Sequence, residues 1–255
     1  MMFLRRTTGL AVWLTLLAGT ASALPSMTID VLDIGGGPQD MTANGTFTPA
    51  VPPAGSSYSW ALNAATPIAE GGGTVNSWTV TARESYPSPG PSVSNNINIT
   101  NTDVVSHVYL ATVLLPIPAA AYDAAVSSSV GATFTDSNSN NSLLLQEDGG
   151  FAMYRAQVNG STVLSLPLGP FTTANCSPNP STPGCSGTGS NAIVSQALAP
   201  GGATSLAILL RFSLSPGDSV GFTDRFQIAP EPYTGAMFSL GLIALGVAGR
   251  RRRRA

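Results

Sequence analysis

Residues 151–166, with the sequence FAMYRAQVNGSTVLSL, decide the fold class of this chain. Asn159-Gly160 stands between two runs of β-forming residues. Both central residues of a type I′ turn need positive φ, and Asn and Gly adopt it most readily. The runs 151–158 and 162–166 are therefore predicted to pair as an antiparallel hairpin.

Short alternating or β-branched runs continue on both sides of this hairpin, and helical periodicity is nearly absent before the C-terminal segment. The stretch Ser215-Pro216-Gly217-Asp218 is predicted to join the last two strands, because Pro presets φ at its second position and Gly tolerates the third. About ten short strands punctuated by Gly, Pro and Asn predict a single antiparallel β-sandwich. The predicted strands are residues 27–34, 58–62, 77–83, 96–100, 107–115, 130–135, 151–158, 162–166, 205–214 and 219–228.

The C-terminal residues 230–255 have the parts of a membrane segment. An uncharged apolar run, residues 234–249, is short against a hydrocarbon core of about 30 Å, but Tyr233 and long arginine side chains can occupy the two interfaces. The terminal charge predicts a cytoplasmic C-terminus and an external domain before it. The alternative is an amphipathic or core helix with a basic nucleic-acid-binding end, and the uninterrupted apolar run argues against it. The flanking residues are Pro230, Glu231 and Pro232 before the run, and Arg250, Arg251, Arg252, Arg253 and Arg254 after it.

The N-terminal residues have the order of a secretory signal peptide. Arg5 and Arg6 precede an apolar run, residues 10–18, and a small-residue site formed by Ala21 and Ala23. Cleavage is expected after Ala23. The residues after the arginine pair lack the apolar pair of a twin-arginine signal, so the general secretory route is favoured.

The tripeptide at residues 230–232, the apolar run and the arginine block together resemble the tripartite sorting tail of bacterial PEP-CTERM proteins, which exosortase enzymes recognise and process. The resemblance implies cleavage near the tripeptide, with exosortase and the secretion machinery as partners and a transient stay in the inner membrane. It divides the chain into a signal peptide (1–23), a β-sandwich ectodomain (24–229) and a sorting tail (230–255). Residues 98–102 and 214–218 also resemble a group of uncharacterised PEP-CTERM ectodomains with an LSPGD hairpin, and that group implies no activity.

Composition excludes one class of partner. The chain has 255 residues and no lysine, and its segment 24–229 holds four arginines against twelve acidic residues, a formal net charge of −8. Nucleic-acid binding is therefore not expected. The polarity of the segment comes instead from Ser, Thr, Asn, Gly and Pro, and enough aliphatic runs remain to build one core of ordinary size.

Cys176 and Cys185 bracket a loop rich in Ser and Pro. In an exported chain this pattern predicts a disulfide that closes a surface loop. For a loop of about ten residues the expected stabilisation is about 2.5–3 kcal/mol. A metal or redox role is not favoured, because the sequence has no Cys-x-x-Cys and no histidine nearby.

Residues 136–147 follow part of a calcium-loop pattern. Asp136, Asn138, Asn140 and Glu147 stand at its positions 1, 3, 5 and 12, whereas Asn141 replaces the usual glycine at position 6. With only two charged ligands, binding would be weak, of order 10⁻⁴ to 10⁻³ M. The favoured alternative is a polar turn between two strands, so calcium is the one cofactor considered and none is assigned.

Catalytic readings find little support, and no catalytic residue is assigned. His107 is the only histidine, and it stands in a strand-like run without a nucleophile-elbow motif, which favours a structural role. Without lysine, Schiff-base and P-loop chemistry are excluded. A glycoside-active enzyme remains a minor alternative, because it needs only two carboxylates. The carboxylates considered are Asp30, Asp33, Asp40, Glu84, Glu147 and Asp148.

Two non-catalytic classes remain for the ectodomain. The first is a structural protein of the envelope or extracellular matrix, and this is the function predicted here. The second is a carbohydrate- or calcium-binding module that contacts extracellular polysaccharide through exposed aromatics, against which core packing of the same rings is the favoured alternative. The aromatics considered are Tyr58, Trp60, Trp78, Tyr86 and Tyr154.

Overall fold

A computed structural model of the chain describes residues 24–49, 57–84, 90–121, 124–136, 144–145, 151–168, 171–172, 186–197 and 202–230. These residues form mainly antiparallel β-strands. Within the described ranges the helices are two short 3₁₀ turns, η1 (Thr42–Asn44) and η2 (Ala69–Gly71). The prediction of a mainly β, antiparallel fold is confirmed.

The first sheet has six strands in the order β12-β11-β15-β8-β1-β2, and every neighbouring pair is antiparallel. Its centre is the long pair β15–β8, which runs from Gly202↔Ala121 to Leu214↔His107. The strands are β1 (Ser26–Val31), β2 (Gln39–Asp40), β8 (His107–Ala121), β11 (Tyr154–Val158), β12 (Ser161–Leu166) and β15 (Gly202–Leu214).

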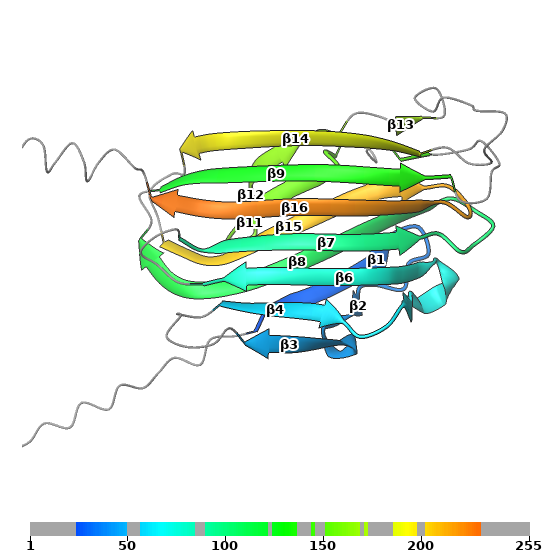
Figure 1. Cartoon of the computed structure of the whole chain (residues 1–255), viewed down its shortest axis with the longest axis horizontal. Coiled ribbons are helices and arrows are strands. Elements are labelled where there is room, and N and C mark those ends of the chain that lie inside the picture. The colour runs from blue at the N-terminus through cyan, green and yellow to red at the C-terminus, as the bar shows by residue number, and fades with distance from the viewer. Residues whose placement is uncertain are drawn as a thin grey trace, which may run out of the picture.

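The second sheet has eight strands, in the order β14-β9-β16-β7-β6-β4-β3 with β5 also paired to β6 (Figure 1). The strands are β3 (Gly45–Pro49), β4 (Ser57–Leu62), β5 (Thr66–Pro67), β6 (Thr74–Arg83), β7 (Ser92–Thr100), β9 (Ala124–Thr135), β14 (Ser186–Ala197) and β16 (Ser219–Pro230). A separate antiparallel pair joins β10 (Leu144–Leu145) to β13 (Phe171–Thr172).

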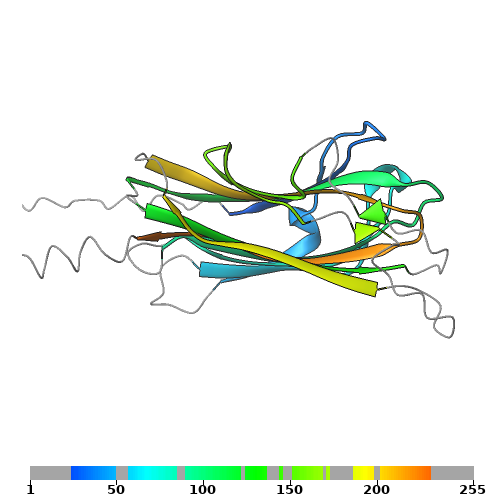
Figure 2. The same ribbon diagram turned by 90° about the horizontal axis from the view of Figure 1, so that it is seen from above.

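The two large sheets lie in two layers, which Figure 2 shows edge-on. Buried and more exposed residues alternate along β1 and β7, as expected for strands with one face toward a core. Phe212 of β15 packs against Phe222 of β16 with ring centroids 4.9 Å apart, so this pair joins the layers. Within the same core, Trp60 and Trp78 meet edge to face at 5.9 Å.

The Asn159-Gly160 turn forms as predicted. Asn159 has φ of 52° and Gly160 has φ of 75°, and the turn joins β11 to the neighbouring β12. The Asn159 side chain adds long-range bonds: Nδ2 donates to the Gly202 carbonyl at 2.7 Å, and Oδ1 accepts from the Thr204 amide at 2.7 Å. The same residue therefore supplies the turn geometry and fixes the start of β15.

The turn at residues 215–218 also forms, and it joins the last two strands, β15 and β16, as predicted. The Asp218 amide donates to the Ser215 carbonyl at 3.3 Å, and Gly217 has φ of 74°. However, β15 belongs to the six-stranded sheet and β16 to the eight-stranded sheet, so the turn connects the two layers. Turn chemistry fixes the local bend, whereas the partner of each strand is set by packing elsewhere in the sheets.

Each predicted strand overlaps an observed one, and the differences lie at the ends. Observed β7 and β9 begin earlier than predicted, and β8 continues past its predicted end, to Ala121. The long strand β14 was not predicted, because its Gly, Ser and Asn residues have low β propensity. It is held at the sheet edge by its pairing with β9.

The two predicted targeting segments lie outside the described residues. This holds for the signal site at Ala21 and Ala23 and for the tail after Pro230, including Glu231, Pro232 and the arginines. In the part of the chain that the structure describes, no helix has the length and apolar character needed to cross a membrane. The last described strand, β16, stays paired with β9 up to Pro230↔Ala124.

Candidate functional site

The aromatic side chains considered for sugar binding lie in the core. Trp60 is 1% exposed and Trp78 is 0% exposed, and Tyr58 and Tyr154 are also buried. The Trp60 indole donates to the Thr42 carbonyl at 3.1 Å, which satisfies its polar atom. An aromatic binding platform made of these four residues is therefore wrong, and core packing is confirmed for them. Tyr86 lies outside the described residues.

Of the predicted calcium loop, residues 136–147, the structure describes Asp136 and the short strand β10 (Leu144–Leu145), which pairs with β13. Asp136 is 2% exposed at the end of β9, whereas Asn138, Asn140 and Glu147 lie outside the described residues. Among the residues that are described, no group of three or more His, Cys, Asp or Glu side chains could hold a metal ion. The calcium site and the Cys176–Cys185 disulfide, whose residues are also not described, both stay predictions.

His107 forms a charged cluster at one end of the domain. Its ring is 4% exposed, and its two nitrogens bind two different carboxylates: Nδ1 lies 2.8 Å from Asp33 Oδ2, and Nε2 lies 2.9 Å from Asp103 Oδ2. Asp33 follows β1, and Asp103 lies in the connection from β7 to β8. We call Asp33, Asp103 and His107 the end cluster. The predicted structural role of His107 agrees with this arrangement.

Both carboxylates of the end cluster are also held by the backbone. Asp33 Oδ1 accepts from the Val108 amide at 3.0 Å, and Asp103 Oδ1 accepts from the Val104 amide at 2.6 Å. Burial alone would lower the pKa of His107, but its hydrogen bonds to Asp103 and Asp33 outweigh burial and raise the pKa above its usual value. The imidazolium form donates from both nitrogens, so it matches two acceptors.

The carboxylate pKa values shift the other way. The hydrogen bond to His107 lowers the pKa of Asp103. For Asp33, burial opposes ionisation, but the Val108 amide and His107 together bring its pKa below the usual value. Asp33 was one of the carboxylates considered for glycoside chemistry, and here it serves as a partner of His107.

Asn101 connects the end cluster to the turn at residues 215–218. Its side chain is fully buried: Nδ2 donates to the carbonyls of Val105 and Leu214 at 2.8 and 2.9 Å, and Oδ1 accepts from the Asp103 amide at 2.9 Å. Its backbone also accepts from Gly217 and donates to Asp218. One side chain therefore satisfies polar groups of two loops that are distant in sequence.

A second polar cluster lies between the sheets. The Trp78 indole donates to Asn95 Oδ1 at 2.6 Å, and Asn95 Nδ2 donates to Asp224 Oδ2 at 2.9 Å. Trp78, Asn95 and Asp224 are all buried, and we call them the inner cluster. The other carboxylate oxygen, Asp224 Oδ1, has no hydrogen-bond partner among the described residues.

Asp224 is held in its neutral form at neutral pH. Removal from water raises its pKa to about 8, and the single hydrogen bond from Asn95 offsets only part of this rise. The same environment raises the pKa of Tyr154, through burial first and the nearby Asp224 second. The Tyr154 hydroxyl pairs with Ser128 Oγ across the layers.

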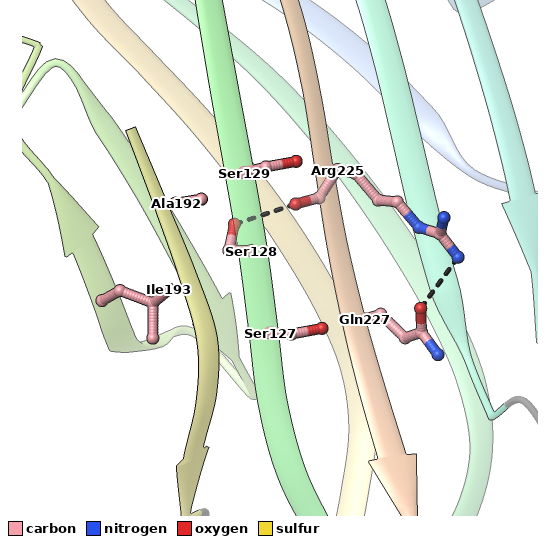
Figure 3. A pocket seen from close by; sticks show the side chains of 7 residues that line it. All are labelled: Ser127, Ser128, Ser129, Ala192, Ile193, Arg225 and Gln227. Atoms are coloured by element: carbon pink, nitrogen blue, oxygen red, sulfur yellow. Dashed lines mark hydrogen bonds between the residues drawn. The ribbon is translucent and has the colours of Figure 1, made fainter. Parts of the chain in front are cut away.

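A groove crosses the outer face of the eight-stranded sheet. One part has a volume of about 340 Å³ and is lined by strands β6, β7, β16 and β9, and a neighbouring part of about 240 Å³ reaches β14. Ser129 and Arg225 line both parts, which we together call the outer groove. Figure 3 shows the residues of the part that reaches β14. Arg225 Nη2 donates to Gln227 Oε1 at 2.8 Å, as the figure shows.

The contacts of His107, the contacts within the inner cluster and the position of Arg225 in the outer groove were not predicted from the sequence. One local signal existed: Asn101 and Asp103 form an Asx turn, which their spacing permits and which could have marked the loop before β8. The remaining contacts join residues far apart in the chain, such as Asn95 and Asp224, which are separated by 129 positions. No spacing rule predicts such pairs.

No family model and no curated protein matches the chain. Among solved structures, it is similar to the carbohydrate-binding module TmCBM61 in complex with β-1,4-galactotriose, at 14% identity and a TM-score of 0.22, over 60% of this chain and 82% of that chain. It is also similar to the infectious bursal disease virus VP2 subviral particle, at 14% identity and a TM-score of 0.10, over 89% of this chain and 72% of that chain. At these TM-scores neither likeness bears on fold or function.

Proposed function

We propose that this chain is an exported bacterial envelope protein whose C-terminal tail is recognised and processed by an exosortase. The observation that carries the proposal is the order of the tail: Pro230-Glu231-Pro232, the uncharged run 234–249 and the arginines 250–254. The signal-like N-terminus supports the same topology, with the domain outside the cytoplasmic membrane. The protein passes through the inner membrane and is then retained at the cell surface or in the extracellular polymer.

In this proposal the domain 24–229 is a single β-sandwich with a structural role outside the membrane. The stacked antiparallel sheets and their shared core support this assignment. The pairing of β16 with β9 up to Pro230 also supports it, because the tail tripeptide then begins directly at a strand held in the sheet. The Cys176–Cys185 disulfide would close a surface loop of this domain in an oxidising compartment.

The sorting proposal is tested by replacing Glu231 with Gln in the native host and following the protein by cell fractionation. We expect the variant to accumulate in the membrane as a precursor, because the recognised tripeptide has lost its charge. Replacing Glu70, which lies in η2 and is distant in sequence from the tail, with Gln serves as the matched control and is expected to mature normally. Normal maturation of Glu231→Gln would contradict recognition of the tripeptide.

Calcium binding by residues 136–147 is a second proposal, and it is tested separately. Titration of the full chain with calcium is expected to raise its melting temperature at millimolar concentrations, because a ligand that binds only the folded state stabilises it. The Glu147→Gln variant removes the position-12 ligand and is expected to lose the effect. An unchanged melting temperature for the unaltered chain would remove calcium from the account of this protein.

A further inference from the structure

The outer face of the eight-stranded sheet differs in charge from the rest of the domain. Its described strands contain a single acidic residue, Asp224. Asp224 is among the residues that line the outer groove, but its side chain is buried and binds Asn95. The same strands carry Arg83 and the exposed Arg225. Exposed or half-buried carboxylates among the described residues lie instead on the other sheet or in the loops at its end, as Asp30 and Asp33 do. A domain with net negative charge therefore has one face that an anion can approach.

Strand register arranges the polar groups of this face in rows. In one row Thr81, Ser94, Arg225 and Ser129 are successive ladder partners across β6, β7, β16 and β9. The next row is Thr79, Asn96, Thr223 and Gly131. Neighbouring strands lie about 4.8 Å apart, so hydroxyl, amide and guanidinium groups repeat at short intervals across the sheet. The outer groove is lined by residues of both rows, among them Arg225 and Thr223.

Gly131, the β9 member of the second row, has no side chain that would project from the sheet. A Cβ atom at this position would meet nothing closer than the Thr223 carbonyl at 3.8 Å, so packing does not require glycine here. Glycine weakens a strand interior and often marks a place where a ligand approaches the backbone closely. Its ladder partner Thr223 lines the outer groove. The position is therefore unexplained by the fold and consistent with a bound polymer.

The polar groups that line the outer groove indicate which class of ligand it could bind. A guanidinium is a planar fork that binds a carboxylate through two parallel hydrogen bonds. Serine and threonine hydroxyls and asparagine amides both donate and accept, which suits the hydroxyls of a sugar ring. Among the described residues that line the groove there is no aromatic side chain, so each sugar unit would bind weakly and a repeating polymer would gain from multiple contacts.

We infer that the outer groove binds a carboxylate-bearing polysaccharide, with Arg225 as the carboxylate ligand and the flanking Thr, Ser and Asn residues as hydroxyl ligands. This goes beyond the sorting proposal, because it names a ligand of the domain itself. It also stands apart from that proposal: binding is measured on the purified chain, whatever happens to its tail in the cell.

The test is affinity electrophoresis of the full chain, purified in detergent, through gels that contain polygalacturonate. Three polymers serve as controls. Methyl-esterified polygalacturonate has the same sugar backbone without the carboxylate charge. Dextran has hydroxyl groups only, and dextran sulfate carries sulfate in place of carboxylate. We expect retardation by polygalacturonate that weakens with salt, and much weaker retardation by the other three polymers. Equal retardation by the esterified polymer would overturn the carboxylate assignment, and equal retardation by dextran sulfate would reduce it to general anion binding.

Three variants locate the site. Arg225→Gln is expected to weaken polygalacturonate binding at least tenfold, and Gly131→Thr is expected to weaken it while the melting temperature is kept or raised. Arg155→Gln, on the other sheet where Arg155 lies over Phe151, makes the same change in charge and is expected to bind normally. Equal loss in Arg155→Gln would show a non-specific charge effect. No retardation of the unaltered chain, or a dimer in sedimentation that only Arg225→Gln dissociates, would overturn the site.

Discussion

The inner cluster and the end cluster each hold a titratable side chain away from water, and they solve the problem in different ways. Asp224 has one hydrogen-bond donor, Asn95, and no cation beside it, so its pKa rises to about 8 and the carboxyl stays neutral. His107 has two carboxylate partners, and their hydrogen bonds raise its pKa despite burial, so the imidazolium is stabilised. Asp224, between the sheets, is uncharged because it is protonated, whereas the charge on His107 is paired with two carboxylates.

The pKa is raised in the folded protein for both Asp224 and His107, but for different reasons. A group whose pKa is raised by folding stabilises the protein below its usual pKa, and the stabilisation is lost as the pH rises through the raised value. That applies to both Asp224 and His107. Asp33 and Asp103 have lowered pKa values, so their contribution is present above the usual value and is lost as the pH falls. Stability is therefore expected to be greatest in mildly acidic solution.

Asp224 should have the greatest influence on stability, through its proton. Between the usual pKa of an aspartate, 3.8, and about 8, the folded protein holds a proton that the unfolded chain releases. The free energy of unfolding should then fall with pH by up to about 1.4 kcal/mol per unit in this window. Asp224→Asn copies the neutral form and should remove this slope, as measured by urea unfolding at pH 5, 6, 7 and 8. An unchanged slope in the variant would show that Asp224 is ionised in the folded protein.

Asn101→Ala should give the next largest effect, a loss of about 3 kcal/mol, because it removes three hydrogen bonds to backbone groups, of which the bond to the Leu214 carbonyl is fully buried. The loss should be independent of pH, because Asn101 does not titrate. This distinguishes the effect of Asn101 from the pH-dependent effect of the end cluster. Urea unfolding at two pH values measures it. Thr102→Ala, at the exposed neighbouring position, is the control and should change little. A loss below about 1 kcal/mol would mean that water satisfies the groups that Asn101 binds.

His107→Gln should destabilise the protein by about 1–2 kcal/mol at pH 5.5, because the two partly exposed carboxylates lose the cation between them. The difference from the unaltered protein should shrink as the pH rises, since His107 then loses its own proton. Melting temperatures across pH 5 to 9 would show this convergence. A difference that stays constant with pH would mean that the ring acts through packing and not through its charge.

Ser128→Ala should give the smallest effect, a loss of about 1 kcal/mol, because it removes the nearer partner of the buried Tyr154 hydroxyl and leaves only the Arg225 carbonyl at 3.5 Å. Neither group titrates near neutral pH, since the pKa of Tyr154 is raised further by burial. The loss should therefore be constant from pH 5 to 8, in contrast to the effect of Asp224→Asn in the same region of the core. A loss that grows with pH would link Ser128 to the ionisation of Asp224.

Local signals in the sequence predict local structure well in this chain. Asn159-Gly160 predicts its hairpin because the turn and both strands lie within a few residues of each other. Pro216-Gly217 predicts its turn equally well, yet the strands on either side enter different sheets. Strand pairing depends on which strand faces pack against a common core, and the turn sequence does not determine that packing.

The polar clusters could not be predicted, because their members are distant in sequence. His107 and Asp33 are separated by 74 positions, and the choice of Asp33 over Asp30 or Asp40 as its partner depends on the register of β1 against β8. Trp60 and Trp78 illustrate the converse. Their alternation with polar residues allows both an exposed platform and a core, with core packing favoured, and in the structure both rings are buried and meet edge to face.

The proposed sorting is tested most directly by the intact mass of the protein recovered from the envelope and the medium of its native host, with both termini resolved. The proposal predicts an N-terminus at Leu24 and a C-terminus near Pro232, without the arginines 250–254. A membrane-bound form that retains those arginines would contradict exosortase processing, and the tail would then be a plain membrane anchor.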